Sequence, residues 1–243
     1  MDRFIIENID GSVGWIYCKE EISHITKTLR MTEGDKLEVT DGKGKAFIGE
    51  IDSISKQEIK ILLLDEIASR ELHTNIIVYQ GIPKAQKMDL IVQKITEIGV
   101  FKIVPVKFER CIRILGEKEE KQIQRWQRIA EEAVKQSKRS RVPDIVKAIS
   151  INDFEKEVRE NDITFLCYEN ESTEMLKNLL HEIKSDREIK KIGIIVGPEG
   201  GITEKEQHQL CSYGAYSVSI GSMILRTETA AIVTSGIIAY ELG

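Results

Sequence analysis

The stretch "IIVGPEGGITEKE", Ile194–Glu206, joins two segments of different character. The apolar run that leads into it, Ile192–Val196, predicts a buried strand, and the Glu- and Lys-rich residues from Thr203 onward predict a helix. A glycine-rich loop between a strand and a helix often binds phosphate through its backbone amides. This loop instead carries a glutamate, Glu199, at its centre and contains no lysine. What such a loop binds is the first question that the sequence raises.

Neither of the two common phosphate-binding patterns fits this loop. A P-loop needs Gly-Lys-Ser/Thr after its glycines, and here Ile202 follows Gly201; a dinucleotide fingerprint needs GxGxxG at the start of the helix. Pro198 offers no amide, and Glu199 would repel a nearby phosphate by ~1–4 kcal/mol. The loop therefore favours a nucleoside that has no phosphate and carries a positive charge, such as the sulfonium of S-adenosylmethionine. An ordinary strand-to-helix turn is the alternative.

The composition is that of a soluble globular protein, because 41% of the 243 residues are hydrophobic and 31% are charged. No apolar run approaches the ~20 residues that a membrane span needs, and the N-terminus does not resemble a signal peptide. The histidines are scattered, and no two cysteines form a CxxC pair, so the sequence predicts neither a metal site nor a disulfide framework. We expect a cytoplasmic protein. The cysteines are Cys18, Cys111, Cys167 and Cys211.

Two patterns divide the chain. Residues 1–70 predict short strands around one helix, Glu20–Met31, which together favour a small β-barrel. A polar joint, Asp65–Thr74, follows. From residue 74 to 243, short apolar runs alternate with amphipathic stretches of helical length, a pattern typical of a mostly parallel sheet with helical crossovers. The fold class predicted is therefore α/β, preceded by a small β domain.

Positive charge is concentrated in one segment of a chain whose net charge is −5. The segment from Arg110 to Arg141 contains ten basic and five acidic residues, a net charge of +5. The rest of the chain therefore has a net charge of −10. Such a basic stripe is typical of nucleic-acid binding, and a solvated helix face is the alternative. The basic residues are Arg110, Arg113, Lys118, Lys121, Arg125, Arg128, Lys135, Lys138, Arg139 and Arg141.

Three predicted strand ends carry unusual chemistry. In an open α/β sheet, ligands bind beyond the carboxyl ends of the strands. One end is "FLCYENES", Phe165–Ser172; another is the glycine-rich loop; the last is "IGSMILRTETAAI", Ile220–Ile232, where a helix follows the turn. Arg226 at the start of that helix opposes the helix dipole at a cost of a few tenths of a kcal/mol, which suggests a use for its charge. A surface pair between Arg226 and Glu228 is the alternative.

Several longer stretches resemble one family. "IVGPEGGITEKE" followed by "IGSMILRTETAAI" resembles the C-terminal signature of the bacterial 16S ribosomal RNA uridine-N3 methyltransferases, which belong to the SPOUT (trefoil-knot) superfamily. "SHITKTLRMTEGDKLEVTDGKG" is similar to the family's PUA-like RNA-binding barrel. "KAQKMDLIVQKITEIGVFKIVPV" and "ERCIR…RWQRIAEEAVKQSKRSRVP" are similar to its central blocks. Cys111 and Ile98 depart from the serine and leucine usual there, and neither position touches the proposed chemistry.

The resemblance implies a fold, a cofactor and partners. We expect a PUA-like barrel over residues 1–70 and a knotted SPOUT domain over 74–243. We also expect S-adenosylmethionine as the cofactor, 16S ribosomal RNA within the small ribosomal subunit as the substrate, and a homodimer. An apolar final helix, Leu225–Glu241, agrees with burial at a subunit interface. The family's cofactor contacts fall on Leu166, Tyr168, Gly197, Glu199, Gly200, Ile220, Gly221, Ile224, Leu225, Arg226, Thr229 and Ala230.

The implied reaction needs a uracil N3 without its proton. Arg226 beside a uracil carbonyl would favour the anionic base, because a neighbouring positive charge lowers a pKa by about 1–3 units. Glu228 would accept the proton or orient Arg226, and the sequence leaves both roles open. The target base must be unpaired or flipped out to reach such a pocket. The residues predicted to contact the RNA backbone are Arg3, Arg30, Lys84, Lys87, Arg110, Arg139 and Arg141.

Three other functions fit parts of the sequence. A SPOUT methyltransferase acting on a ribose 2′-hydroxyl usually lacks an N-terminal PUA-like barrel. A non-catalytic RNA-binding factor for ribosome assembly would need neither Arg226 nor the loop glycines, and both are present. A nucleotide-binding α/β enzyme would need a phosphate site, and no pattern in the sequence supplies one.

Overall fold

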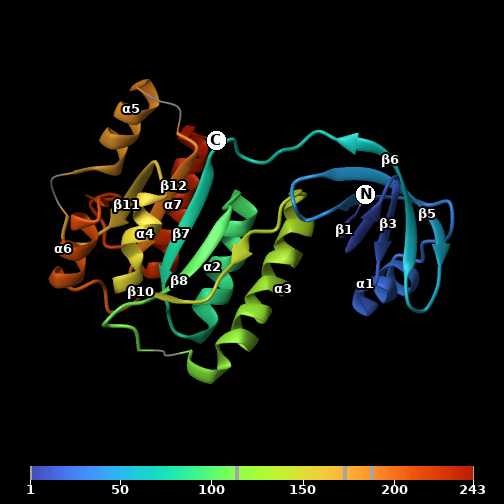
Figure 1. The fold of residues 1–243 in the computed structure, drawn as a ribbon, viewed down its shortest axis with the longest axis horizontal. Coiled ribbons are helices and arrows are strands. Elements are labelled where there is room, and N and C mark those ends of the chain that lie inside the picture. The colour runs from blue at the N-terminus through green and yellow to red at the C-terminus, as the bar shows by residue number, and fades with distance from the viewer. Residues whose placement is uncertain (1, 113–114, 172–173, 187–188, 243) are drawn as a thin grey trace. The chain divides into compact units, whose positions relative to one another are not determined.

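The computed structural model describes residues 2–112, 115–171, 174–186 and 189–242 (Figure 1). Arg113 of the basic segment and Ser172 of the first strand-end loop lie outside these ranges. The chain forms two compact units. The N-terminal unit contains Met1–Glu71 together with Glu131–Val142, and the C-terminal unit contains Leu72–Ala130 and Pro143–Gly243.

A curled six-stranded sheet forms the N-terminal unit. Its strand order is β1-β4-β5-β6-β3-β2; the β1–β4 pair is parallel and the other pairs are antiparallel. Inward-facing apolar residues such as Phe4, Leu37 and Ile61 form its core, together with Ile25 from the helix. The strands are β1 (Arg3–Ile5), β2 (Asn8–Asp10), β3 (Val13–Ile16), β4 (Lys36–Thr40), β5 (Ala46–Ile54) and β6 (Ile59–Ile67).

Two details of this unit differ from the sequence-based expectation. The β2–β3 hairpin was not predicted, because strands of three and four residues around Gly11 are too short to show an alternating pattern. The predicted helix Glu20–Met31 is α1 (Lys19–Ser23), which continues as a π-helical turn, His24–Thr28. It stops before Met31 because Arg30 adopts a left-handed conformation with φ of 56°.

An all-parallel sheet forms the centre of the C-terminal unit. Its order is β10-β8-β7-β12-β11-β13, and β9 pairs with β8. The central strands are buried on both faces, which explains their continuous apolar sequences. The strands are β7 (Asn75–Gly81), β8 (Lys102–Lys107), β9 (Asp144–Ile145), β10 (Ile149–Ser150), β11 (Ile163–Cys167), β12 (Lys191–Val196) and β13 (Tyr216–Val218).

Helices surround this sheet (Figure 1). α2 and α7 pack against each other, and α7 also contacts β7 and β12. The predicted final helix begins two residues later than expected, so Arg226 precedes it. The helices are α2 (Ala85–Ile98), α3 (Glu119–Ser137), α4 (Phe154–Arg159), α5 (Leu176–Asp186), α6 (Glu204–Ser212) and α7 (Thr227–Leu242), with 3₁₀ turns at Gly116–Lys118 and Ile151–Asp153.

The strand order creates a switch point between β7 and β12. From β7 the chain crosses through α2 to β8 on one side, and from β12 it crosses through α6 to β13, beyond β11, on the other. The connections leave these adjacent strands in opposite directions, so a crevice opens beyond their carboxyl ends. The glycine-rich loop, Gly197–Gly201, begins at this point.

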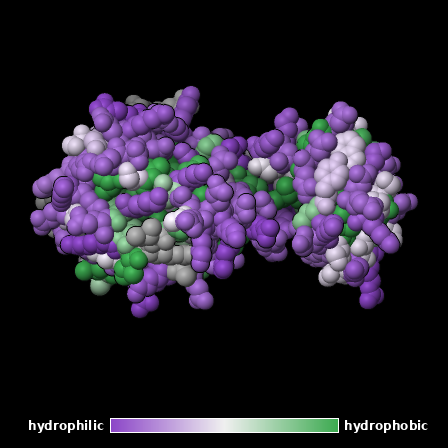
Figure 2. Space-filling model, turned by 60° about the horizontal axis from the view of Figure 1, so that its bottom comes forward, coloured by the Kyte–Doolittle hydropathy of each residue, from purple (hydrophilic) through white to green (hydrophobic). Residues whose placement is uncertain are grey.

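The face of the chain drawn in Figure 2 is mostly hydrophilic, with apolar side chains reaching it in small patches. Met223 and Ile224, which precede α7, are 77% and 80% exposed, and Tyr240 near its end is 86% exposed. Among the described residues, no helix combines the length and apolar character that crossing a membrane requires. The same residues contain no group of three or more His, Cys, Asp or Glu side chains placed to hold a metal ion.

Candidate active site

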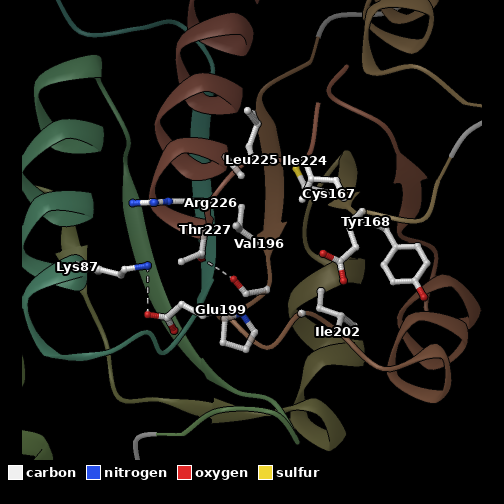
Figure 3. A pocket seen from close by; sticks show the side chains of 15 residues that line it. Lys87, Cys167, Tyr168, Val196, Glu199, Ile202, Ile224, Leu225, Arg226 and Thr227 are labelled. Atoms are coloured by element: carbon white, nitrogen blue, oxygen red, sulfur yellow. Dashed lines mark hydrogen bonds and ion pairs between the residues drawn. The ribbon is translucent and has the colours of Figure 1, made fainter. Parts of the chain in front are cut away.

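Two adjoining cavities lie where the three predicted strand-end segments meet. The first, about 330 Å³, is bordered by the ends of β11 and β12, by the residues before α7, and by Lys87 of α2 (Figure 3). The second, about 480 Å³, extends toward Ile220–Met223. Both cavities share Cys167, Tyr168, Glu169, Ile224, Leu225 and Ala230. The structure therefore brings together residues as far apart in the chain as Lys87 and Ala230.

Glycines let the loop after β12 pack against its neighbours. A Cβ on Gly81, at the end of β7, would lie 2.5 Å from the backbone nitrogen of Pro198. One on Gly200 would lie 2.9 Å from Cβ of Arg110, and Gly201 has a φ of +73°. Close packing within the protein thus explains some of the glycines in this loop. This agrees with the alternative interpretation of the loop as an ordinary strand-to-helix turn. The same packing fixes the loop at the rim of the first cavity.

Glu199 caps the helix that begins beside it. Its Oε1 accepts a hydrogen bond from the backbone N–H of Lys84 (3.1 Å), the N-cap residue of α2, whose own side chain makes no cap. A carboxylate is favourable there because the helix N-terminus carries partial positive charge. Partial burial opposes ionisation, but backbone N–H groups of Glu199 and Lys84 and the charge of Lys87 together lower the pKa of Glu199. The loop carries a glutamate at its centre partly because that carboxylate binds α2.

Lys87 joins two carboxylates from different loops. Its Nζ lies 3.4 Å from Oε1 of Glu199 and 3.0 Å from Oε2 of Glu228. The hydrogen bond with Glu228 is the largest of the effects that raise the pKa of Lys87. Burial opposes ionisation of Glu228, but its own backbone N–H and then Lys87 lower the pKa of its carboxyl group. All three groups are therefore ionised at neutral pH.

Arg226 is the remaining cation at the cavity. Its side chain is exposed, and within the described part of the chain its guanidinium has no ion pair or hydrogen bond. The surface pair between Arg226 and Glu228 that we considered does not form, because Lys87 occupies that carboxylate. Figure 3 shows the Arg226 and Lys87 side chains next to each other on the same side of the cavity.

A buried relay positions the start of α7. The amide of Gln80, at the end of β7, donates to Oγ1 of Thr227 (2.9 Å), and the Thr227 hydroxyl donates to the carbonyl oxygen of Gly197 (2.6 Å). Both side chains are buried. The relay holds the glycine-rich loop against the segment that presents Arg226. Sequence reasoning missed it, although a glutamine at the end of the apolar run of β7 was a usable signal.

We expect Thr227→Val to lower the free energy of unfolding by ~1–3 kcal/mol, because it removes the hydroxyl that accepts a hydrogen bond from the buried Gln80 amide and donates one to the carbonyl oxygen of Gly197. Thr229→Val in the same helix is the matched control, since no hydrogen bond to the Thr229 hydroxyl occurs among the described residues; its effect should stay within about 0.5 kcal/mol. Urea unfolding measures both. Equal effects for the two variants would show that the relay contributes nothing of its own.

Most of the predicted cofactor residues border the cavities. Tyr168, Gly197, Glu199, Ile224, Leu225, Arg226 and Ala230 line the first, and Ile220 and Gly221 line the second. Leu166 is fully buried inside β11. Gly200 and Thr229 do not line either cavity. Glu228, predicted to be catalytic, does not line them either, but it forms an ion pair with Lys87, which borders the first cavity. The contact of each residue with a cofactor stays a prediction.

The residues predicted to contact RNA are divided between the two units. Arg30, Lys84 and Arg110 are exposed, and Arg110 donates to the carbonyl oxygen of Gly200 (3.1 Å). Lys87 borders the cavity, where it pairs with Glu199 and Glu228. Arg141 donates to the carbonyl oxygen of Lys43 (3.1 Å).

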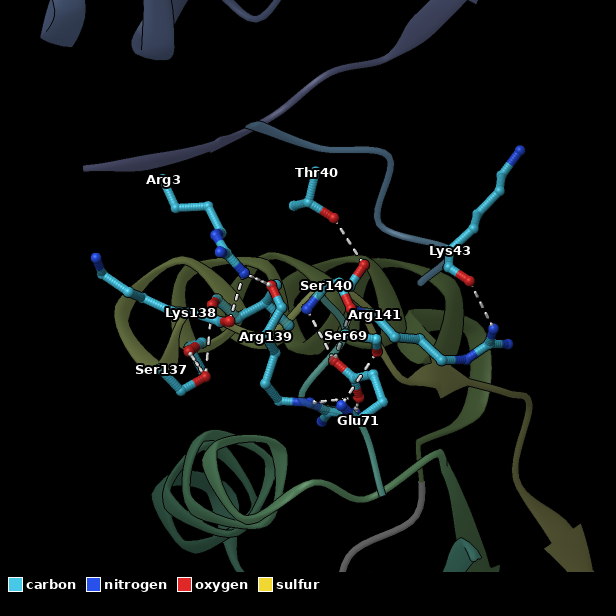
Figure 4. Close-up of polar contacts among 12 residues, drawn as sticks. Arg3, Thr40, Lys43, Ser69, Glu71, Ser137, Lys138, Arg139, Ser140 and Arg141 are labelled. Atoms are coloured by element: carbon cyan, nitrogen blue, oxygen red, sulfur yellow. Dashed lines mark hydrogen bonds and ion pairs between the residues drawn. The ribbon is translucent and has the colours of Figure 1, made fainter. Parts of the chain in front are cut away.

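Arg3 and Arg139 correct the RNA prediction, because both are buried (Figure 4). Arg3 pairs with Glu38 at 2.9 Å and also donates to the carbonyl oxygen of Arg139 (3.1 Å). Arg139 pairs with Glu71 at 2.6 Å. The same Glu71 carboxylate accepts the backbone N–H groups of Ser140 (2.8 Å) and Arg141 (3.0 Å). Both arginines therefore hold the segment Glu131–Val142 within its own unit and are not available to a phosphate.

Comparison with known proteins gives one consistent result. Residues 70–239 match the model of an RNA methyltransferase domain, and residues 17–64 match that of an RNA methyltransferase PUA domain. The chain is 31% identical to ribosomal RNA small subunit methyltransferase E of Bacillus subtilis, covering 99% of this chain and 97% of that protein. It is 34% identical to the protein of the same name from Rickettsia conorii, covering 86% and 82%.

Solved structures agree. The ribosomal RNA small subunit methyltransferase E of Neisseria gonorrhoeae, bound to S-adenosyl methionine, superposes with a TM-score of 0.84 at 29% identity over 99% of this chain and 97% of that one. A putative methyltransferase from Legionella pneumophila in complex with the same cofactor gives 0.84 at 26% identity, covering 98% and 96%. The predicted fold class, a SPOUT α/β trefoil-knot domain preceded by a PUA-like β domain, is confirmed.

Proposed function

Because the chain belongs to the ribosomal RNA small subunit methyltransferase E family, we propose that it transfers the methyl group of S-adenosylmethionine to N3 of a uridine in 16S ribosomal RNA. The observation that carries this proposal is the Arg226 guanidinium, which has no ion pair or hydrogen bond among the described residues and lies at a cavity whose glycine-rich loop lacks the phosphate-binding patterns. Relatives of the same fold bind S-adenosylmethionine. We extend that binding to the cavities at the β7–β12 switch point.

The cavity suits a cationic nucleoside. Glu169 and Glu199 border it, and the loop beside it lacks the lysine and the glycine spacing that phosphate sites use. Apolar side chains, among them Ile202 and Leu225, provide surfaces for an adenosine. When bound, S-adenosylmethionine supplies an electrophilic methyl group on sulfur and leaves as S-adenosylhomocysteine.

Arg226 prepares the target base. The imide N–H of uracil must lose its proton before N3 can attack a methyl carbon, and a guanidinium beside the uracil carbonyl stabilises the resulting anion. Burial opposes ionisation of Glu228, but its own backbone N–H and then Lys87 lower the pKa of its carboxyl group, so Glu228 is a weak base here. Of the two roles that the sequence left open for Glu228, the geometry favours an electrostatic one, and the N3 proton passes to water.

The remaining partners belong to the same proposal. α7 has apolar residues on its exposed side, including Val233 and Tyr240, which suits a contact with a second copy of the chain. We therefore propose a homodimer that acts in the cytoplasm on RNA of the small ribosomal subunit. We also propose that residues 1–70 form the RNA-binding domain and that residues 74–243 form the catalytic one.

Mass spectrometry of 16S ribosomal RNA tests the chemistry. We expect cells that lack this protein to lose one 3-methyluridine, and we expect purified protein with S-adenosylmethionine to restore it. Loss of a 2′-O-methylated nucleotide would identify a ribose methyltransferase instead, and unchanged RNA would identify a non-catalytic binding protein. Calorimetry with S-adenosylmethionine, S-adenosylhomocysteine, ATP and NAD tests the pocket separately, and binding of ATP or NAD alone would refute the cofactor.

A further inference from the structure

We propose that Lys87 is a positioning residue, which pairs with Glu199 and Glu228 and thereby leaves the Arg226 guanidinium free for the target base. This inference rests on the proposed function and goes beyond it, because it assigns to a residue of α2 control over a residue that precedes α7. The sequence had placed Lys87 among the RNA backbone contacts.

The geometry places one ammonium between two carboxylates. Lys87 lies in the first turn of α2, with Glu199 from the loop after β12 and Glu228 from the first turn of α7 at 3.4 and 3.0 Å. The Glu228 side chain is 14% exposed and the Lys87 side chain 33%, so water is only partly excluded from the pair. Arg226 borders the same cavity, on the side where Figure 3 shows Lys87, and its guanidinium has no ion pair among the described residues.

Charge explains what Lys87 prevents. Arg226 already acts on Glu228 electrostatically, since its charge is one of the effects that lower the pKa of that carboxyl group. If Lys87 were absent, Arg226 would be the remaining one of the two cations that lower the pKa of Glu228. A guanidinium forms close carboxylate pairs readily, and a paired guanidinium stabilises a uracil anion poorly. Lys87 therefore determines whether the Arg226 guanidinium pairs with Glu228 or stays available to the uracil anion.

The test compares Lys87→Met with the double variant Lys87→Met, Glu228→Gln. We expect Lys87→Met to lower kcat by roughly 10- to 100-fold, with little change in KM for S-adenosylmethionine. Its pH–rate profile should shift to higher pH, because less positive charge acts on N3. The double variant should recover activity to near that of Glu228→Gln alone, since the Glu228 carboxylate is no longer there to bind Arg226 and Glu199 keeps its hydrogen bond from the backbone N–H of Lys84. Lys87→Arg keeps the charge and should keep most of the rate.

Other outcomes would overturn the proposal. A double variant that is no faster than Lys87→Met would show that Glu228 does not capture Arg226. A raised KM for RNA with unchanged kcat, and a salt dependence reduced by about one phosphate contact, would restore Lys87 to the RNA contacts. Lys87→Gln provides a second test where Lys87→Met folds poorly. Wild-type protein that neither binds S-adenosylmethionine nor methylates RNA would refute the proposed function itself, a result that the variants cannot mimic.

Discussion

Replacing Arg226 with alanine will lower the rate of methyl transfer by roughly 10²–10³-fold, while the affinity for S-adenosylmethionine changes by only a few-fold. In the proposed mechanism the guanidinium acts on charge that develops at the uracil, so its loss should affect the transition state more than the bound ground state. Single-turnover methylation of 16S ribosomal RNA measures the rate, and calorimetry measures cofactor binding.

Arg226→Lys is the matched variant for this prediction. It keeps a positive charge but loses the planar group that can contact a carbonyl oxygen through two N–H donors, so we expect an intermediate rate. Both variants should need higher pH than the wild type to reach half of their maximal rate, because the pKa of the uracil N3 is then lowered less by the neighbouring charge. Unchanged turnover together with intact cofactor binding would remove Arg226 from the mechanism.

The local parts of the site could be predicted from the sequence. The apolar run Ile192–Val196, the glycine-rich loop and the helix after Thr203 are each signalled by neighbouring residues, and the structure has all three. The exclusion of phosphate also needed only the loop's own residues. The resemblance supplied the superfamily and its knotted fold, which neither periodicity nor spacing indicated.

The partners of charged residues could not be predicted, because they come from distant parts of the chain. Glu199 binds the N-terminus of α2, which is 115 residues earlier, and Lys87 pairs with Glu228 at the far end of the sequence. Arg139 forms its ion pair with Glu71, which lies 68 residues earlier in the chain. A basic residue that will be buried in an ion pair looks the same in the sequence as one that will contact phosphate. The RNA predictions therefore failed at Arg3 and Arg139.

Replacing Glu71 with alanine will destabilise the N-terminal unit by ~3–5 kcal/mol, because it removes the carboxylate that forms an ion pair with the buried Arg139 guanidinium. The Arg139 side chain is 8% exposed and the Glu71 side chain 17%. Glu71 also satisfies two backbone N–H groups at the end of the basic segment, those of Ser140 and Arg141. Glu155→Ala, which breaks an exposed pair with Arg159 in α4, is the control and should cost about 0–1 kcal/mol.

The two tryptophans allow each unit to be followed separately. Trp15 lies in β3 of the N-terminal unit, and Trp126 is buried in the C-terminal unit. In a Trp126→Phe background, urea unfolding followed by Trp15 fluorescence reports the N-terminal unit. We expect Glu71→Ala to move this transition to lower urea and Glu155→Ala to leave it in place. A shift of equal size for both variants would show that the buried Arg139–Glu71 pair stabilises the N-terminal unit no more than the exposed Arg159–Glu155 pair does.

The pH dependence of unfolding distinguishes whether Glu71 stabilises the N-terminal unit through its charge or through its packing. Burial opposes ionisation of Glu71, but Arg139 and the amides of Ser140 and Arg141 lower its pKa in the folded state. Its stabilising contribution is therefore complete above the unfolded-state pKa, about 4.3, and is lost as the pH falls through the lower folded-state value. The difference between wild type and Glu71→Ala should accordingly shrink in acid. A difference that persisted there would mean that Glu71 acts through packing, because a protonated carboxyl group no longer balances the charge of Arg139.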